Sequence, residues 1–326
     1  MKAIVYEKYG TPEVLQLKDV EKPAPKDDEV LVKVHAASVN YIDWQVLSGE
    51  SYFLRLTNGG LLKPKHKILG DDIAGRVEAV GANVKQFQPG DEVFGISNFD
   101  AFAEFACVPE KALARKPGSI TFEEAAAIPY AGITALQGLR DHGQVQPGQK
   151  VLINGASGGV GTFAVQIAKS FGAEVTGVCS TSKLDMVRSI GADHVIDYTR
   201  EDFVESGQRY DLILAFAGNR SIFEYKRALS PGGIYICGGG SLAQFFQATL
   251  LGLLISMTGS QKLGSYIGNP NPKDYGFLIE LYEAGKVVPV IDKRYPLSAV
   301  PEALRYYGSG NARGKIVISV VQNNKT

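Results

Sequence analysis

A glycine-rich turn between a predicted buried strand and a predicted helix constrains the fold more than any other feature. The apolar run at 151–154 is followed by Gly155-Ala156-Ser157-Gly158-Gly159-Val160-Gly161, and an amphipathic pattern then continues to Lys169. A dinucleotide-binding turn needs this order, because its backbone approaches a pyrophosphate closely and the helix start directs N–H groups at the phosphates. Ala156 stands at the first glycine position of the motif, and Gly158 and Gly161 stand at the second and third. We therefore predict that residues 156–161 bind a dinucleotide; the alternative is a glycine turn in an α/β domain without a nucleotide.

The end of the next predicted strand, at 174–180, indicates which dinucleotide is bound. An NAD-specific fold places an acid there to bind the ribose 2′-hydroxyl. This chain has Ser180, Thr181, Ser182 and Lys183 instead. An ammonium and hydroxyls would bind a 2′-phosphate by charge-assisted hydrogen bonds, whereas a carboxylate would repel it. We predict NADPH as the cofactor; Thr181 or Ser182 could equally serve only to cap the helix that begins at Lys183.

Length and composition limit the classes of protein to consider. A chain of 326 residues predicts two domains, and the balance of 34 Lys+Arg against 34 Asp+Glu gives no reason to expect nucleic-acid binding. Cys107, Cys179 and Cys237 are odd in number and far apart, which is typical of thiols in a reducing compartment. The chain starts with a strand-like pattern and no targeting signal, so a cytoplasmic protein is expected. The apolar segment 242–257 is shorter than the roughly 20 residues of a membrane span, and we expect a buried helix that lines a cleft or an interface.

The pattern of elements changes twice along the chain. Up to about residue 123, short alternating runs separated by Gly, Pro and Asp predict a β domain. Thr121 begins a capping box, after which a helix over 131–139 and alternating strands and helices predict a parallel, doubly wound sheet. The strands are expected at 151–154, 174–180, 194–198, 211–216 and 233–237, with helices at 159–171 and 183–190. Beyond residue 267 we expect helices at 275–284 and 299–307 and strands at 287–291 and 315–320.

Several further blocks, in order along the chain, carry a family likeness. They are the segments 37–43, 70–75, 88–93, 132–136, 191–193 and 312–316. With the glycine turn, they resemble the zinc-independent medium-chain dehydrogenase/reductases of the quinone oxidoreductase and enone reductase type. The resemblance implies an α/β protein with a GroES-like, β-rich catalytic domain from residues 1–123 and 267–326 and a Rossmann domain at 124–266. It also implies that cofactor and substrate lie in the cleft between the domains.

The chain departs from the zinc-bearing members of that superfamily. These have a cysteine near positions 41–43 and Gly-His-Glu where this chain has Gly70-Asp71-Asp72, and none of His35, His66, His142 and His194 has ligand spacing with a cysteine. We therefore expect no metal. Without a Lewis acid, hydride addition to a quinone or to the C=C of an α,β-unsaturated carbonyl is favoured, because hydrogen-bond donors can stabilise the charge on oxygen. The alternatives are a zinc-free alcohol or aldehyde reductase and a non-catalytic NADPH-binding scaffold.

The resemblance also suggests catalytic residues. Asn40 corresponds to a cleft asparagine whose amide would bind a substrate carbonyl or the nicotinamide ribose. Tyr41, Tyr52 and Tyr130 resemble cleft residues, although any of the 15 tyrosines could simply pack or lie on the surface. Asp43 either orients Asn40 or lies solvated in a turn.

Further candidates are expected to contact the cofactor. Thr134 is expected on the nicotinamide side, and Tyr198 near the adenosine or its 2′-phosphate. Ligands bind at the carboxyl ends of the strands in such sheets, so we assign cofactor contacts to Phe216, Ala217, Gly218, Gly238 and Gly239. Arg313 and Lys315 either reach the phosphates or are solvated charges beside a strand.

A homodimer is predicted from the resemblance and from one edge of the sheet. The strand near 233–238 is expected to end the sheet, with the apolar segment 242–257 beside it. An exposed strand edge next to apolar side chains favours association with a second copy.

Overall fold

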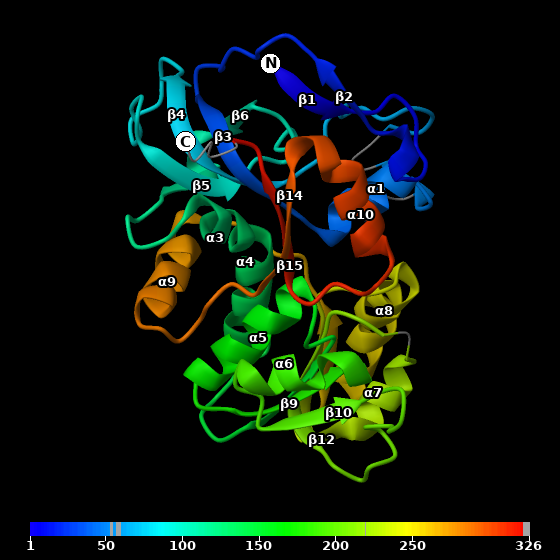
Figure 1. The fold of residues 1–326 in the computed structure, drawn as a ribbon. Helices are drawn as coiled ribbons and strands as arrows, with labels where there is room; N and C mark the ends of the chain where they lie inside the picture. The colour runs from blue at the N-terminus through cyan, green and yellow to red at the C-terminus, as the bar shows by residue number, and fades with distance from the viewer. Residues whose placement is uncertain (53–54, 57–59, 219, 322–326) are drawn as a thin grey trace. The chain divides into compact units, whose positions relative to one another are not determined.

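The chain forms two compact units, and each combines segments that are distant in the sequence. The computed structural model describes residues 1–52, 55–56, 60–218 and 220–321. Unit 1 comprises Met1–Tyr130, Pro270–Ile279 and Ile291–Thr326, and unit 2 comprises Ala131–Asn269 and Glu280–Val290 (Figure 1). The predicted boundary at residue 123 falls inside helix α3 (Phe122–Ala127), whose alanines are buried and which packs on strands of unit 1. Residues 280–290 belong to unit 2, although they were expected in the catalytic domain.

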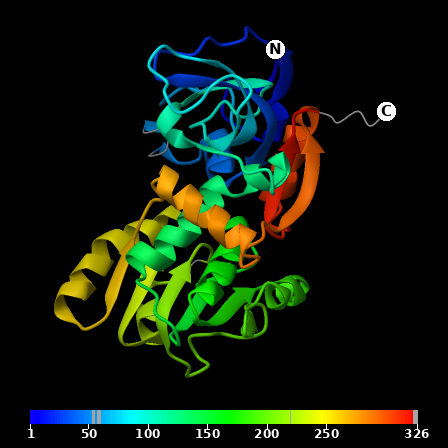
Figure 2. The same cartoon turned by 90° about the vertical axis from the view of Figure 1, so that its left-hand side faces the viewer.

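Unit 1 is built on a sheet with the strand order β14-β15-β3-β4-β5-β7, and β6 pairs with the long strand β3. β15, from late in the chain, pairs antiparallel with β3, and Ile316 is opposite Val39. Figure 2 shows β14 and β15, in orange and red, beside the blue N-terminal strands. Alternating apolar residues such as Val30, Val32 and Val34 are fully buried and form the core of this unit. The strands are β1 (Lys2–Val5), β2 (Gln16–Asp19), β3 (Glu29–Val39), β4 (Asp72–Val80), β5 (Glu92–Ile96), β6 (Phe105–Pro109), β7 (Leu113–Arg115), β14 (Ile291–Pro296) and β15 (Lys315–Ser319), and the helices include α1 (Tyr41–Ser48) and α10 (Val300–Gly308).

Unit 2 contains a parallel sheet with the order β10-β9-β8-β11-β12-β13. Successive strands are added on one side of β8 up to β10 and on its other side from β11 onward, so the strand order reverses between β8 and β11. That reversal is the point where open α/β sheets bind ligands. The strands are β8 (Lys150–Asn154), β9 (Glu174–Cys179), β10 (His194–Asp197), β11 (Tyr210–Ala215), β12 (Leu229–Cys237) and β13 (Lys262–Ser265). The helices are α5 (Gly159–Ser170), α6 (Leu184–Ser189), α7 (Ile222–Ala228) and α8 (Leu242–Thr258), while α4 (Pro129–Gln137) and α9 (Pro272–Glu283) cross the limits of the units. The predicted combination of a β-rich unit and a unit with a doubly wound parallel sheet is confirmed.

The strand predicted at 287–291 is wrong. The backbone N–H and C=O of Val288 bind the side chain of Gln166 at 2.9 and 3.0 Å, and Pro289 has no N–H to donate to a sheet. The strand starts only at Ile291.

The predictions for the sheet edge and for segment 242–257 also need correction. β13 follows β12 in the sheet, so the strand near 233–238 is not at the edge. Helix α8 buries Gln244, Ala248, Gly252 and Ile255, whereas Leu250 and Met257 are 65% and 76% exposed. The segment is therefore buried along one face only. Within the described ranges, no helix combines the length and apolar character needed to cross a bilayer.

Candidate functional site

Two positions of the turn after β8 require glycine. Gly155 has φ +89°, a conformation that other residues rarely adopt, and a Cβ at Gly161 would lie 2.0 Å from the Gly155 carbonyl oxygen. The left-handed residue of the turn is therefore Gly155, which the sequence interpretation missed because it lies one position before Ala156, the first position of the predicted motif. Ala156, at that later position, is fully buried. A Cβ at Gly177 would lie 3.0 Å from the Ala156 Cβ, so Ala156 packs against β9.

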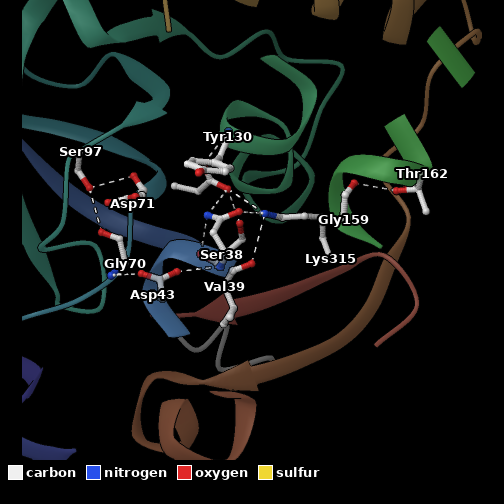
Figure 3. A network of polar contacts seen from close by, with 12 residues as sticks. Ser38, Val39, Asp43, Gly70, Asp71, Ser97, Tyr130, Gly159, Thr162 and Lys315 are labelled. Atoms are coloured by element: carbon white, nitrogen blue, oxygen red, sulfur yellow. Dashed lines mark hydrogen bonds and ion pairs between the residues drawn. The ribbon is translucent and has the colours of Figure 1, made fainter. Parts of the chain in front are cut away.

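The start of α5 presents backbone N–H groups at the end of β8. Gly158 is the N-cap, and the Thr162 N–H donates to its carbonyl at 2.9 Å. The N–H groups of the preceding three residues, Gly159 to Gly161, therefore come before the first intrahelical bond. Figure 3 shows the helix start with the Thr162 hydroxyl donating to the Gly159 carbonyl. With the helix dipole, such N–H groups form an anion site.

The backbone N–H groups of Gly155 and Ala156, earlier in the turn, already donate hydrogen bonds within the protein. They donate to the Val178 carbonyl at 3.2 and 3.1 Å. Ser157 is buried beside them. The available anion-binding groups therefore begin at the helix rather than at Ala156.

Hydroxyls and a cation lie at the ends of β9 and β10. The Thr181 hydroxyl donates to Asp197 and bonds the Thr199 hydroxyl at 3.2 Å. The N-cap of α6 is Lys183, with no side-chain cap hydrogen bond, so the alternative that Thr181 or Ser182 caps this helix is wrong. The Thr181 bond, with others from Thr199, holds the pKa of Asp197 below its ordinary value. Ser180 and Lys183 are partly exposed on the same segment, and Tyr198 is 60% exposed after β10.

The loops that follow β11 and β12 lie against the glycine turn. A Cβ at Gly155 would meet the Ala217 Cβ at 2.8 Å, and a Cβ at Gly239 would lie 3.1 Å from the Phe216 carbonyl oxygen. Gly218 has φ +98°, and its Cβ would lie 2.7 Å from Asn154 Nδ2. The predicted residues 156–161, 216–218 and 238–239, together with Gly155, thus lie together where the strand order of the sheet reverses between β8 and β11.

Thr134 is buried in α4, within unit 2. The Thr134 carbonyl accepts a hydrogen bond from the Tyr266 hydroxyl, and a Cβ at Gly268 would lie 3.1 Å from the Thr134 hydroxyl oxygen. A Cβ at Gly238 would meet the ring of the same Tyr266 at 2.7 Å. Tyr266 therefore connects Thr134 with the loop after β12.

Unit 1 contains a buried group of charged and amide side chains, which we call the polar cluster: Asn40, Asp43, Asp71, Asp72 and Lys315. Figure 3 labels Asp43, Asp71 and Lys315 of this cluster. Asn40 is the N-cap of α1, and Asp43 completes its capping box three residues later. Asp72 begins β4, and Lys315 begins β15. The pairing of both strands with β3 brings residues from distant parts of the sequence together.

Lys315 is 2% exposed, and its ammonium group is fully engaged. Nζ donates to Asn40 Oδ1 at 2.5 Å, to Asp72 Oδ2 at 3.0 Å and to the Val39 carbonyl at 3.4 Å. These bonds use the three donors of an ammonium. The expectation of a solvated charge at Lys315 is wrong, and an ammonium bound in this way has no donor left for a cofactor phosphate.

The amide of Asn40 is engaged in the same way. Nδ2 donates to Asp72 Oδ2 at 3.0 Å and to the Ser38 carbonyl at 3.5 Å, while Oδ1 accepts from Lys315. The expected direct bond from this amide to a substrate is therefore not favoured. Asp43 is fully buried and accepts the N–H groups of Asn40 and Gly70 at 2.8 Å each, so it orients Asn40 and does not lie solvated in a turn.

Burial of so many carboxyl groups changes their proton affinity. Desolvation raises the pKa of Asp71 to about 7, against the opposing effect of the Phe99 N–H, which donates to it at 2.7 Å. Desolvation and the nearby Asp71 raise the pKa of Asp43 as well. Phe99 and its neighbours have φ values of 55°, 81° and 69°, an unusual run in the left-handed region that directs this N–H at Asp71.

The three candidate tyrosines have different environments. Tyr130 donates its backbone N–H to Asp72 Oδ1 at 2.8 Å, and burial raises the pKa of its hydroxyl. Tyr41 begins α1 beside the polar cluster and is 40% exposed. Tyr52 is 72% exposed, with the Arg55 guanidinium 5.1 Å from its ring centre.

Arg313 is exposed and donates its backbone N–H to Asp292, outside the polar cluster.

The side chains at the polar cluster do not fit a zinc site. In the described part of the chain, no set of three or more His, Cys, Asp or Glu side chains is arranged to bind a metal ion. Asp72 Oδ2 already accepts from Ser38 at 2.6 Å, from Asn40 and from Lys315. A buried ammonium at that carboxylate would also repel a metal cation.

Comparison with known proteins assigns both parts of the chain. Residues 26–118 match the alcohol dehydrogenase GroES-like domain, and residues 190–318 match the zinc-binding dehydrogenases. Over 98% of its length the chain is 35% identical to NAD(P)H oxidoreductase RTN4IP1, mitochondrial, of Mus musculus, of which it covers 89%. It is also 35% identical, over 98% of its length, to 2-methylene-furan-3-one reductase of Solanum lycopersicum, of which it covers 79%. The structure of Escherichia coli quinone oxidoreductase complexed with NADPH superposes with a TM-score of 0.84 at 26% identity, covering 98% of this chain and 100% of that one.

Proposed function

This chain belongs to the medium-chain dehydrogenase/reductases of the quinone oxidoreductase type, and from that premise we propose that it prefers NADPH to NADH and needs no metal. It is an NAD(P)H-dependent oxidoreductase that reduces quinones or the C=C of α,β-unsaturated carbonyls. One observation supports the proposal most strongly. The glycine turn at 155–161 lies where the strand order reverses, and the end of β9 is followed by Ser180 to Lys183 and has no acidic residue.

The residues of unit 2 fit a dinucleotide. The N–H groups of Gly159 to Gly161 and the dipole of α5 would bind the pyrophosphate. Ser180, Lys183 and Tyr198 would bind the adenosine 2′-phosphate. The backbone at 216–218 and 238–239 would lie against the nicotinamide ribose, because these loops follow β11 and β12 at the carboxyl ends of the strands, where open α/β sheets bind ligands.

The chemistry requires a donor for the oxygen on which charge develops. When bound, NADPH supplies a hydride to the carbon β to the carbonyl. We assign donation to the substrate oxygen to Tyr41 and Tyr52, since their rings are exposed, while the amide of Asn40 is bound within the polar cluster. The polar cluster fixes the start of α1, which carries Tyr41. No step is assigned to zinc, because the side chains of this unit do not fit a zinc ion.

The position of hydride delivery tests the reaction. Deuteride from labelled NADPH should appear at the β carbon of the saturated ketone formed from an enone. Label at the carbonyl carbon would instead identify an alcohol or aldehyde reductase. A panel of quinones, enones and aldehydes that leaves NADPH unconsumed would identify a binding scaffold.

The hydroxyl donors can be separated by substitution. Tyr41→Phe or Tyr52→Phe should lower kcat roughly tenfold or more, the order of effect seen when one oxyanion donor is removed, with little change in the Kd for NADPH. Tyr295→Phe, in β14, is the control. If both variants keep the wild-type kcat, neither phenol is the donor.

The cofactor preference can be tested at Lys183. Lys183→Ala should weaken NADPH binding by about 1–3 kcal/mol and leave NADH nearly unchanged, because only NADPH carries the 2′-phosphate. Lys262→Ala, in β13, is a matched control, since β9 and β13 lie apart in the sheet order. Equal affinity of the wild type for both cofactors would contradict the proposal.

We also propose a homodimer formed through unit 2. β13 is the last strand in the sheet order, α8 packs on it, and the exposed part of α8 carries apolar side chains. The cytoplasmic location stays a prediction, since one of the relatives above is named as mitochondrial.

A further inference from the structure

A second cluster of buried polar side chains lies in unit 2, near the carboxyl ends of β8 and β12. We call it the strand-end network: Asn154 at the end of β8, Tyr225 in α7, Tyr235 and Cys237 in β12, and Gln244 in α8. Asn154 is 7% exposed, and Gln244 is 3% exposed. None of these side chains is among the groups assigned above to the phosphates or to substrate. Their role must therefore be sought in what they contact.

Hydrogen bonds connect the members of the network across several elements. Gln244 Nε2 lies 3.2 Å from the Tyr225 hydroxyl and 2.9 Å from the Tyr235 hydroxyl, and Asn154 Nδ2 donates to the Tyr225 hydroxyl at 2.9 Å. The rings of Tyr225 and Tyr235 stack with centroids 4.3 Å apart. One glutamine from α8 thus fixes the two tyrosines that β12 and α7 contribute.

The network also contacts the loops that follow β11 and β12. Asn154 Nδ2 donates to the Ala217 carbonyl at 2.9 Å, and the Cys237 thiol donates to the Gly239 carbonyl at 3.2 Å. A Cβ at Gly240 would lie 3.3 Å from Gln244 Oε1. Buried polar side chains of the network therefore form hydrogen bonds with both loops that are proposed to bind the nicotinamide end.

Gln244 is not explained by stability alone. Its Oε1 has no hydrogen-bond partner among the residues that the structure describes, and it lies against Gly240. A buried amide oxygen without a partner lowers stability, and this cost offsets part of what the two Nε2 bonds to the tyrosines contribute.

We propose that Gln244 is a positioning residue for the nicotinamide end of the cofactor. From α8 it fixes the Tyr225–Tyr235 pair, and through the network it keeps the loops after β11 and β12 in the shape that admits the nicotinamide. This inference rests on the proposed cofactor site, and it assigns no contact between Gln244 and the phosphates.

Two ligands distinguish this role from a general loss of structure. NADPH occupies the whole proposed site, whereas adenosine 2′,5′-bisphosphate contains only the adenine half and would bind near Ser180 and Lys183. Gln244→Met removes both Nε2 bonds and keeps the length of the side chain. We expect its Kd for NADPH to rise about tenfold and its Kd for the bisphosphate to stay within about twofold of wild type.

Control variants are available on the same elements. Gln247→Met changes the same residue type on α8, where Gln247 accepts the Ile222 N–H at 3.4 Å and does not belong to the strand-end network, so NADPH binding should not change. Tyr235→Phe removes one partner of Gln244 without altering α8 and should weaken NADPH in the same direction, by about threefold. It also tests the proposal if Gln244→Met does not fold.

The outcomes separate the inference from the proposed function. The inference is overturned if Gln244→Met and Tyr235→Phe bind NADPH as wild type does, or if they lose affinity for both ligands equally. Failure of the wild-type protein to bind NADPH would overturn the proposed function itself.

Discussion

Lys315 shows how one side chain determines whether a buried site is stable. Its ammonium lies among the carboxyl groups of the polar cluster, and Lys315 and Asp72 are 2% and 0% exposed. Lys315→Met should lower the free energy of unfolding by about 3 kcal/mol or more, because it leaves the Asp72 carboxylate buried without a counter-ion. Urea unfolding measures this loss. Combining Lys315→Met with Asp72→Asn should recover part of it, and a loss below about 1 kcal/mol in the single variant would contradict the buried ion pair.

A second residue in that cluster makes stability depend on pH. The pKa of Asp71 is about 7 in the fold, against its ordinary value of 3.8. Between these values the folded chain binds more protons than the unfolded chain, so this group lowers the free energy of unfolding as pH rises from about 4 to about 7. Asp71→Asn removes that dependence. The Tm of the variant relative to wild type should therefore increase across this pH range.

The Asp71 prediction has a simple control on the surface. Asp185→Asn changes a carboxylate whose side chain is fully exposed, and its Tm relative to wild type should not follow the same pH trend. A parallel pH profile for Asp71→Asn and wild type would show that Asp71 ionises as an ordinary carboxyl group.

The turn between β8 and α5 lets stability and cofactor binding be separated within one element. A Cβ at Gly161 would lie 2.0 Å from the Gly155 oxygen, whereas a Cβ at Gly158 would lie 3.5 Å from that atom. Gly161→Ala should lower the free energy of unfolding by about 2 kcal/mol and weaken NADPH binding. Gly158→Ala should leave stability within about 0.5 kcal/mol but still weaken NADPH, since this glycine lets the backbone approach the pyrophosphate. Thermal unfolding and NADPH titration of both variants measure the difference.

Elements with local signals could be predicted from the sequence. The capping box at Thr121 and the strand at 151–154 were found within one residue of α3 and β8, because caps and apolar runs depend only on neighbouring residues. β13 was missed, since Lys262–Ser265 is short and contains a glycine. The strand expected at 287–291 fails because its backbone bonds to Gln166, 122 residues away.

The roles of side chains were harder to predict than the elements that carry them. Lys315 bonds Asn40 across 275 residues of sequence, so no local pattern indicates that the two groups engage each other. The expectation that Asn40 contacts substrate and Lys315 contacts phosphate followed from each residue taken alone. Gln244 was missed for the same reason, because its partners lie on other elements. Gly218, Gly238 and Gly239 were assigned to the cofactor because they come just after predicted strands, whereas Gly155, directly after β8, was missed.

At the scale of the whole molecule, α8 makes the state of association testable. Leu250, Leu254 and Met257 follow one another at helical spacing and are 65%, 60% and 76% exposed. Apolar side chains grouped in this way favour contact with a second copy. Changing both leucines to aspartate should convert the proposed dimer to a monomer at micromolar concentration, as measured by light scattering, whereas Leu17→Asp in β2 should not. A wild-type protein that is already monomeric would contradict the proposal.

The order of segments along the chain has a consequence for synthesis. β15 lies between β14 and β3 in the sheet of unit 1, yet it follows all of unit 2 in the sequence. While the chain emerges from a ribosome, β3 can pair with β4 and β6, but its other edge waits for β15. Until then Asp72 also lacks the lysine that neutralises it. Most of unit 2 leaves the ribosome before unit 1 can close, so the later-starting unit is expected to fold first.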